Sequence, residues 1–245
     1  LDLEPNLVHQ VARCLGTCLT ITAAREELKH MRPDGLQALL ELAVAHIEQP
    51  GGGNIADAAM RALAHACSPS SGLALRLAAV PGAVVALAKL LSTPRSRTRQ
   101  AALACVVQLA GDAAKEGQTP ADLTPLVPPL VALLANEGET NQMQIGAAVC
   151  SLGTLEGYGI HLMTSGALGV LHELALSASQ GVQLVCQQAL DACTRCLTPT
   201  SRRVYVSRAV TVRGKAIHRR RSRLASNLAS SQCGDGYETG RPGHD

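Results

Sequence analysis

Two short patterns combine residue types that bind metals or attack substrates: Cys193-x-x-Cys196 and the adjacent pair His172-Glu173. A structural zinc site needs four ligands, and no partner pair accompanies the two cysteines. The thioredoxin-type use of such a pair requires a strand–helix–strand setting, which this chain lacks. His172-Glu173 lacks the second histidine that a zinc-protease helix carries at its fifth position. We therefore expect all four to be ordinary helix residues, with the cysteines acting as small buried hydrophobic side chains.

Signatures of enzymes are absent elsewhere in the chain. It contains neither a Gly-x-Ser-x-Gly nucleophile elbow nor a glycine-rich phosphate-binding loop of the Walker type. The sequence predicts a non-enzymatic protein with no metal and no cofactor. The enzymatic alternative would need thiol chemistry at Cys193 or Cys196.

A cluster of basic residues lies towards the carboxyl-terminal end. Its members are Lys215, Arg219, Arg220, Arg221 and Arg223. Such a cluster can act as a nuclear import signal or bind the phosphates of a nucleic acid. The other interpretation is a disordered basic arm with no function of its own.

Charge is divided unevenly along the chain. Residues 1–198 hold 12 lysines and arginines against 16 acidic residues, whereas residues 199–245 hold 10 against 3. The last residues, 233–245, are rich in glycine and charge, which is typical of disorder. This asymmetry predicts a folded domain over residues 1–198 and a basic, disordered tail over residues 199–245.

The composition favours closely packed helices. Hydrophobic residues make up 47% of the chain, but there are three tyrosines, no phenylalanine and no tryptophan. The nine cysteines lie mostly within helical apolar patterns, which indicates a reduced, intracellular protein, cytoplasmic or nuclear. No uncharged apolar segment is long enough to predict a membrane span, so we expect no membrane partner.

Four copies of one apolar segment set the organisation of the chain. When they are aligned on Leu40, Leu87, Leu130 and Leu171, they are 47, 43 and 41 residues apart. A period of about 40–47 residues is typical of helical solenoids, in which no single repeat buries its apolar face alone. A second helical run follows each copy, at residues 55–67, 97–109, 141–155 and 183–197, and residues 7–19 resemble such a run.

A shorter third run precedes three of the copies, at residues 23–31, 72–79 and 158–163. In the third repeat the corresponding run, at residues 113–119, is interrupted by Gly117, so we expect that repeat to be irregular. Three helices in about 42 residues, with a glycine before the second helix, resemble the armadillo repeat. The stretches that carry the resemblance best are residues 31–42, 80–110 and 163–176.

The resemblance implies an all-α, right-handed superhelical solenoid of about four to five three-helix units over residues 7–197. A helical array of the HEAT type is the nearest alternative. Gly35, Gly82 and Gly166 stand where one helix turns sharply into the next, so we expect close backbone approach and positive φ there.

In armadillo proteins that bind extended peptides, the third helix of each unit lines a groove and carries an asparagine, with a tryptophan one turn earlier. The positions of this chain that match the asparagine are Thr17, His65, Gln108 and Thr154. Those that match the tryptophan are Arg13, Arg61, Ala104 and Cys150. Because neither residue type is present, the resemblance does not extend to importin-like binding of basic nuclear signals.

The resemblance therefore predicts a protein-binding groove without the usual asparagines. Its candidate residues are Arg13, Thr17, Arg61, His65, Arg97, Gln108 and Thr154. The arginines would suit an acidic or mixed peptide, since guanidinium groups pair well with carboxylates. The other interpretation is that these are solvated positions between repeats.

Together these features predict a scaffold or adaptor that binds another protein or an extended peptide. The alternative is a nucleic-acid-associated or nuclear factor, which would contact nucleic acid through the tail alone.

Overall fold

The computed structural model describes residues 4–31, 34–49, 51–69 and 71–195, and within these ranges every regular element is a helix. The chain opens with α1 (Pro5–Cys18), and two complete three-helix units follow. The first unit holds α2 (Thr22–His30), α3 (Gly35–Ile47) and α4 (Gly53–Ala66), and the second holds α5 (Leu73–Ala79), α6 (Ala83–Leu91) and α7 (Ser96–Glu116).

The later units follow the same order. The third contains a short 3₁₀ helix, η1 (Thr124–Leu126), then α8 (Val127–Asn136) and α9 (Glu139–Thr154). The fourth contains α10 (Tyr158–Thr164), α11 (Ala167–Ser177) and α12 (Gln180–Arg195). The predicted tail and its basic cluster, together with Cys196, lie outside the described residues, so the expected domain boundary near residue 199 stays a prediction.

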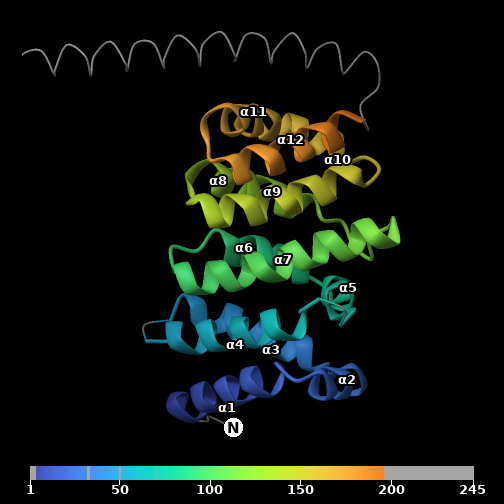
Figure 1. Ribbon diagram of the computed structural model, residues 1–245. Coiled ribbons are helices and arrows are strands. Elements are labelled where there is room, and N and C mark those ends of the chain that lie inside the picture. Colours follow the sequence, from blue (N-terminus) through green and yellow to red (C-terminus); the bar gives the residue numbers. More distant parts are fainter. Residues whose placement is uncertain (1–3, 32–33, 50, 70, 196–245) are drawn as a thin grey trace, which may run out of the picture. The chain divides into compact units, whose positions relative to one another are not determined.

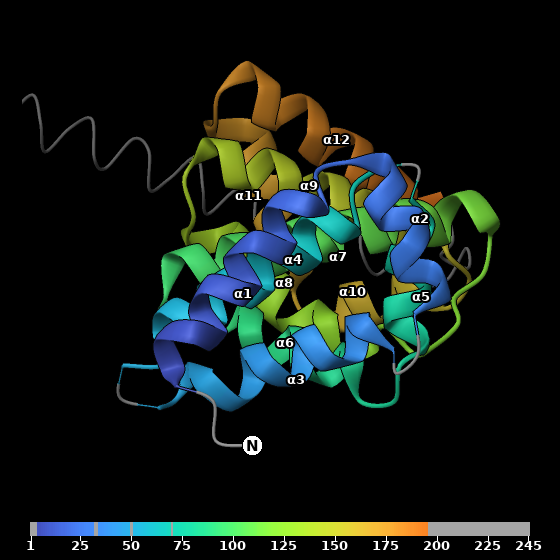
Figure 2. The ribbon, with the colours of Figure 1, turned by 90° about the horizontal axis from the view of Figure 1, so that it is seen from below.

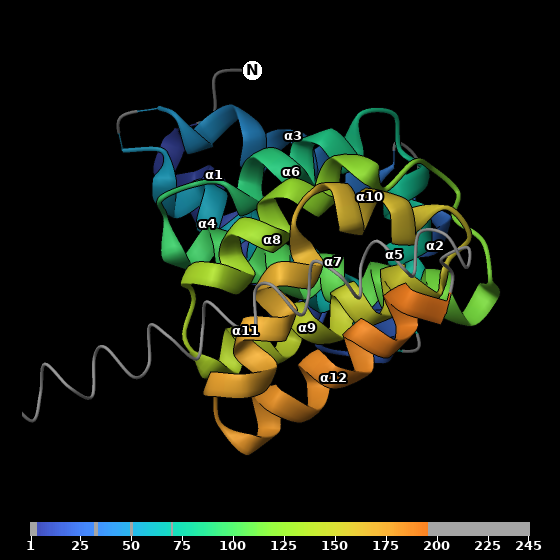
Figure 3. The same cartoon turned by 90° about the horizontal axis from the view of Figure 1, so that it is seen from above.

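The helices form two parallel rows (Figure 1). The third helices α1, α4, α7, α9 and α12 contact one another in chain order, and so do the second helices α3, α6, α8 and α11. Figures 2 and 3 show the stack from its two ends, with α1 beside α4 and α12 beside α9. Each unit therefore packs mainly on its neighbours, which confirms the predicted solenoid.

Repeating leucines and small residues build the core. The four leucines that align the repeats, Leu40, Leu87, Leu130 and Leu171, are all buried, and none is more than 4% exposed. Alanines are numerous among the other buried residues, and their small side chains let neighbouring helices approach closely. This packing explains how a chain with so few aromatic residues fills its core.

Two of the three predicted glycine turns have the expected backbone. Gly82 and Gly166 precede α6 and α11 with φ of 77° and 84°, values that L-residues rarely adopt. The prediction of positive φ is wrong for Gly35, which begins α3 after an Asp34 N-cap whose carboxylate accepts a hydrogen bond from the Leu36 amide at 2.9 Å. Gly35 instead allows close approach, because a Cβ there would lie 2.6 Å from Leu28 Cδ1.

The third unit is irregular, as predicted. α7 continues to Glu116 and ends at Gly117, which has a φ of 68°, and no separate first helix lies between Gly117 and η1. The Tyr158 hydroxyl reaches back from α10 and accepts a hydrogen bond from the Leu123 amide at 2.8 Å. One aromatic side chain thus links the irregular connection to the next unit.

Candidate protein-binding site

A surface cavity of about 210 Å³ lies between α1 and α4, at the amino-terminal end of the row of third helices. It brings together four of the predicted groove residues. The lining residues are Arg13, Gly16, Thr17, Thr20, Ala58, Arg61 and His65. Sequence reasoning missed Thr20, although it follows Thr17 by one helical turn.

Small residues bring the two helices close enough for their polar side chains to share this space. Gly16 faces Ala62, and a Cβ built on Gly16 would lie 3.6 Å from the Ala62 Cα atom. Both residues are buried, while Arg13 and Arg61 are exposed. The two arginines therefore reach the cavity from neighbouring repeats.

The cavity is basic, and its charges have no counter-ions. No acidic residue lines it, and within the described ranges no hydrogen bond or ion pair engages the side chain of Arg13 or Arg61. Asp57 precedes Arg61 by one turn of α4, but its carboxylate accepts a hydrogen bond from the Thr98 hydroxyl of α7. That contact engages the nearest carboxylate of α4 with the next repeat.

The hydroxyl groups of the cavity donate to their own helix. Thr17 Oγ1 donates to the Arg13 carbonyl oxygen at 3.2 Å, and Thr20 Oγ1 donates to the Thr17 carbonyl oxygen at 2.7 Å. His65 is half-buried, and its imidazole has no hydrogen-bond partner within the described residues. The donors available to a ligand are therefore the two guanidinium groups and the imidazole.

The other three predicted groove residues lie outside this cavity. Arg97 is exposed in the first turn of α7. Gln108 Nε2 donates to Asp112 Oδ1 at 2.7 Å, and Thr154 Oγ1 donates to the Ser151 carbonyl oxygen at 2.7 Å. Since Gln108 and Thr154 already use donors on their own helices, they are poorly suited to grip a peptide backbone.

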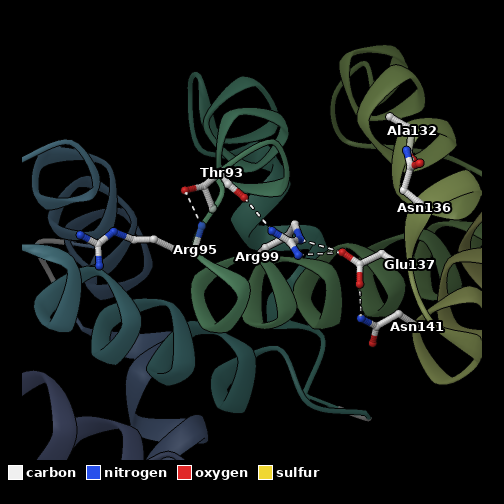
Figure 4. A network of polar contacts seen from close by, with 7 residues as sticks. All are labelled: Thr93, Arg95, Arg99, Ala132, Asn136, Glu137 and Asn141. Carbon is white, nitrogen blue, oxygen red and sulfur yellow. Dashed lines mark hydrogen bonds and ion pairs between the residues drawn. The ribbon is translucent and has the colours of Figure 1, made fainter.

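A second cavity, of about 70 Å³, lies between α7 and the α8–α9 region. Figure 4 shows the polar network beside it, in which Glu137 Oε1 accepts hydrogen bonds from Arg99 and Glu137 Oε2 accepts one from Asn141 Nδ2 at 2.9 Å. Arg99 Nη1 also donates to the Thr93 carbonyl oxygen at 2.9 Å. Because these charges satisfy one another, this cluster joins two repeats and leaves little for a ligand to bind.

The cysteines give no catalytic arrangement in the described part of the chain. Cys193 is buried, and burial raises the pKa of the Cys186 thiol to about 11. A hydrogen bond with Cys105, together with burial, raises the pKa of Cys67. No group of three or more histidines, cysteines or carboxylates able to hold a metal ion occurs among the described residues.

Within the described residues, no single helix has both the length and the apolar character needed to cross a membrane. The helix pair α5 and α6 meets both criteria when taken together, but it is bent by 105° at its break.

The fold has close counterparts among solved structures. No protein-family model and no curated protein sequence matches the chain. An engineered protein solved by the Northeast Structural Genomics Consortium has a TM-score of 0.67 and 21% identity over 94% of this chain and 93% of that one. A designed armadillo repeat protein in complex with the peptide (KR)4 has a TM-score of 0.62 and 21% identity, covering 78% of this chain and 77% of that one.

A second engineered protein from the same consortium has a TM-score of 0.63 and 20% identity, with 86% of this chain and 82% of that chain covered. At such identities the likeness shows the fold alone. The chain has an armadillo-like repeat fold, an all-α solenoid of stacked helical units.

Proposed function

We propose that this protein is a non-enzymatic scaffold that binds an extended segment of another protein along its row of third helices. One observation carries the proposal: Arg13 and Arg61, from successive third helices, line the same surface cavity and have no counter-ion among the residues that the structure describes. The architecture supports it, since a designed armadillo repeat protein of this fold is described in complex with a peptide.

We expect a mode of binding that differs from that of armadillo proteins whose asparagines bind the backbone of the peptide. Three of the four positions that match the asparagines, Thr17, Gln108 and Thr154, donate within their own helices. We therefore expect most of the affinity to come from charged side chains of the ligand.

The test is a selection of peptides from a displayed random library on the full chain, followed by fluorescence anisotropy with the enriched peptides. Exchanging Arg13 and Arg61 for glutamate should abolish binding, because the ligand would then face two carboxylates. Lys89→Glu, a charge reversal at an exposed residue of the second helix α6 and outside the row of third helices, is the control. Enriched peptides that bind the double variant as tightly as the unchanged protein would refute the proposal.

The nucleic-acid alternative rests on the basic cluster at residues 215–223, which lies outside the described residues. We propose a cytoplasmic or nuclear location on the basis of the cysteine content and this cluster. A fluorescent fusion, with and without residues 199–245, tests the location. Gel retardation at low salt tests the nucleic-acid alternative, because a phosphate-binding tail loses affinity steeply as salt rises.

A further inference from the structure

We propose that the cavity between α1 and α4 binds a phosphoryl group, presented by a phosphorylated residue of the bound peptide. This inference rests on the proposed function and adds the chemistry of the ligand. It depends on how many hydrogen-bond donors line the cavity, on which helices carry them, and on whether they already have partners in the described residues.

The charge of the cavity matches a dianion better than a carboxylate. One guanidinium group forms a bidentate pair with one carboxylate and neutralises it. Arg13 and Arg61 would then leave one cation unpaired. A phosphoryl group carries a charge of about −1.5 to −2 at neutral pH and three acceptor oxygens, so it can engage both arginines at once.

The donor set also fits this ligand. The guanidinium groups come from two helices, and His65 adds a third polar side chain on the same lining. The threonine hydroxyls donate elsewhere, so they do not supply further donors. A phosphoryl group needs donors alone, because its oxygens carry no proton to give when it is doubly charged.

The space is adequate for such a group. The cavity holds about 210 Å³, whereas a water molecule in the liquid occupies about 30 Å³. A phosphoryl group and the methylene that carries it displace only a few waters. The rest of the peptide can leave the cavity along the row of third helices.

The arginines of this protein that have structural roles are bound differently. Arg76 donates to the Lys29 carbonyl oxygen and pairs with Asp34 at 3.2 Å, and Arg99 pairs with Glu137 at 2.8 Å. Arg13 and Arg61 have no such partners in the described ranges.

The experiment measures binding of three fluorescein-labelled degenerate peptide pools to the full chain by anisotropy. The pools share random flanks and carry phosphoserine, glutamate or serine at the central position. We expect the phosphoserine pool to bind at least about tenfold more tightly than the glutamate pool, because a phosphoryl group has the charge and the acceptor oxygens to pair with both arginines, whereas one carboxylate neutralises only one. Inorganic phosphate should compete, and added salt should weaken binding.

Variants assign the effect to the cavity. Arg13→Ala and Arg61→Ala should each lower the preference for phosphoserine over glutamate by about tenfold and leave the serine pool unchanged. Lys89→Ala, on the second helix α6, should change neither. All three side chains are exposed, so the variants should fold, and thermal unfolding checks this. His65→Ala tests the third donor, and we expect a smaller loss.

The outcomes separate this inference from the proposed function. Equal binding of the glutamate and phosphoserine pools, both lost in Arg61→Ala, would overturn the phosphoryl assignment and leave the scaffold intact. A phosphoserine preference that persists in the Arg13→Ala, Arg61→Ala double variant would place the phosphate site elsewhere and overturn it too. If library peptides bind through the cavity but the phosphoserine pool does not bind, the phosphoryl assignment is overturned and the scaffold proposal stands.

Discussion

The ion pair between Arg99 and Glu137 should contribute measurably to the coupling of the second and third repeats. Arg99 belongs to α7, and Glu137 is the C-cap residue of α8. Glu137 accepts hydrogen bonds from Arg99 Nε at 2.9 Å and from Asn141 Nδ2 at 2.9 Å (Figure 4). The pair spans the boundary where the third unit lacks a separate first helix.

The expected coupling energy of this ion pair follows from the burial of its two side chains. The side chains of Arg99 and Glu137 are 24% and 17% exposed, between a surface pair and a core pair. Exposed pairs are worth about 0.2–1 kcal/mol, and hydrogen bonds to charged groups about 1.5–3 kcal/mol. We expect Glu137→Ala to lower the free energy of unfolding by about 1.5–3 kcal/mol and the coupling energy of the pair to be about 1–2 kcal/mol.

The assay is a double-mutant cycle with Arg99→Ala, Glu137→Ala and the double variant. Urea unfolding followed by far-ultraviolet circular dichroism gives the free energy of unfolding. The pair formed by Lys89 and Glu48 is the control, since its atoms are also 2.8 Å apart but its side chains are 53% and 73% exposed. Its cycle should give a smaller coupling than that of Arg99 and Glu137, because both side chains are largely exposed to water.

Two results would refute the reasoning. A coupling at Arg99–Glu137 no larger than that of the control pair would mean that partial burial adds nothing to the interaction. A coupling that disappears in about 1 M salt would mean that the pair is screened as a surface pair is. Either result would remove this cluster as a link between repeats.

Three further predictions concern single positions. Gly82→Ala should destabilise the protein by about 1–2 kcal/mol in urea unfolding, because φ is 77° there. Gly111→Ala, in a helix with open space around the residue, should stabilise the protein by about 0.5–1 kcal/mol in the same assay. A hydrogen bond from Thr124 lowers the pKa of the Asp122 carboxyl. The ionised Asp122 therefore stabilises the fold above its ordinary pKa, and this stabilisation is lost as pH falls through the lowered pKa. Asp122→Asn should flatten this part of the profile of unfolding free energy against pH, measured down to about pH 3. Among the described cysteines, Cys14 and Cys18 are exposed. Iodoacetamide should label these two in the native protein well before the buried cysteines, as read by peptide mass spectrometry. Rapid labelling of Cys193 would revive the thiol alternative.

The repeat pattern predicted most of the fold because it reports local and nearest-neighbour physics. Aligned leucines mark the core face of each second helix, and all four are buried in the structure. Glycines before the second helices predicted positive φ correctly at Gly82 and Gly166. The prediction was wrong at Gly35, because an Asp34 N-cap closes that turn and the glycine serves a contact with Leu28 on the preceding helix.

The candidate site was predicted in part. The resemblance placed Arg13, Thr17, Arg61 and His65 on equivalent faces of successive helices, and the structure lines one cavity with them. The resemblance also predicted Gln108 as a groove residue, but the Gln108 side-chain amide donates a hydrogen bond to Asp112 on its own helix. Equivalence along a helix does not reveal which side chains find partners nearby.

The sequence by itself determined the helical repeat, its period and the apolar face of each unit, since these depend on residues within one or two helical turns. Tertiary structure alone decided which arginines are free. Arg76 and Arg99 meet carboxylates 42 and 38 residues away, and Asp57 is held by Thr98, 41 residues along the chain. Asp57, one turn before Arg61, contacts the next repeat and forms no ion pair with Arg61 within the described residues, a relation that no local pattern encodes.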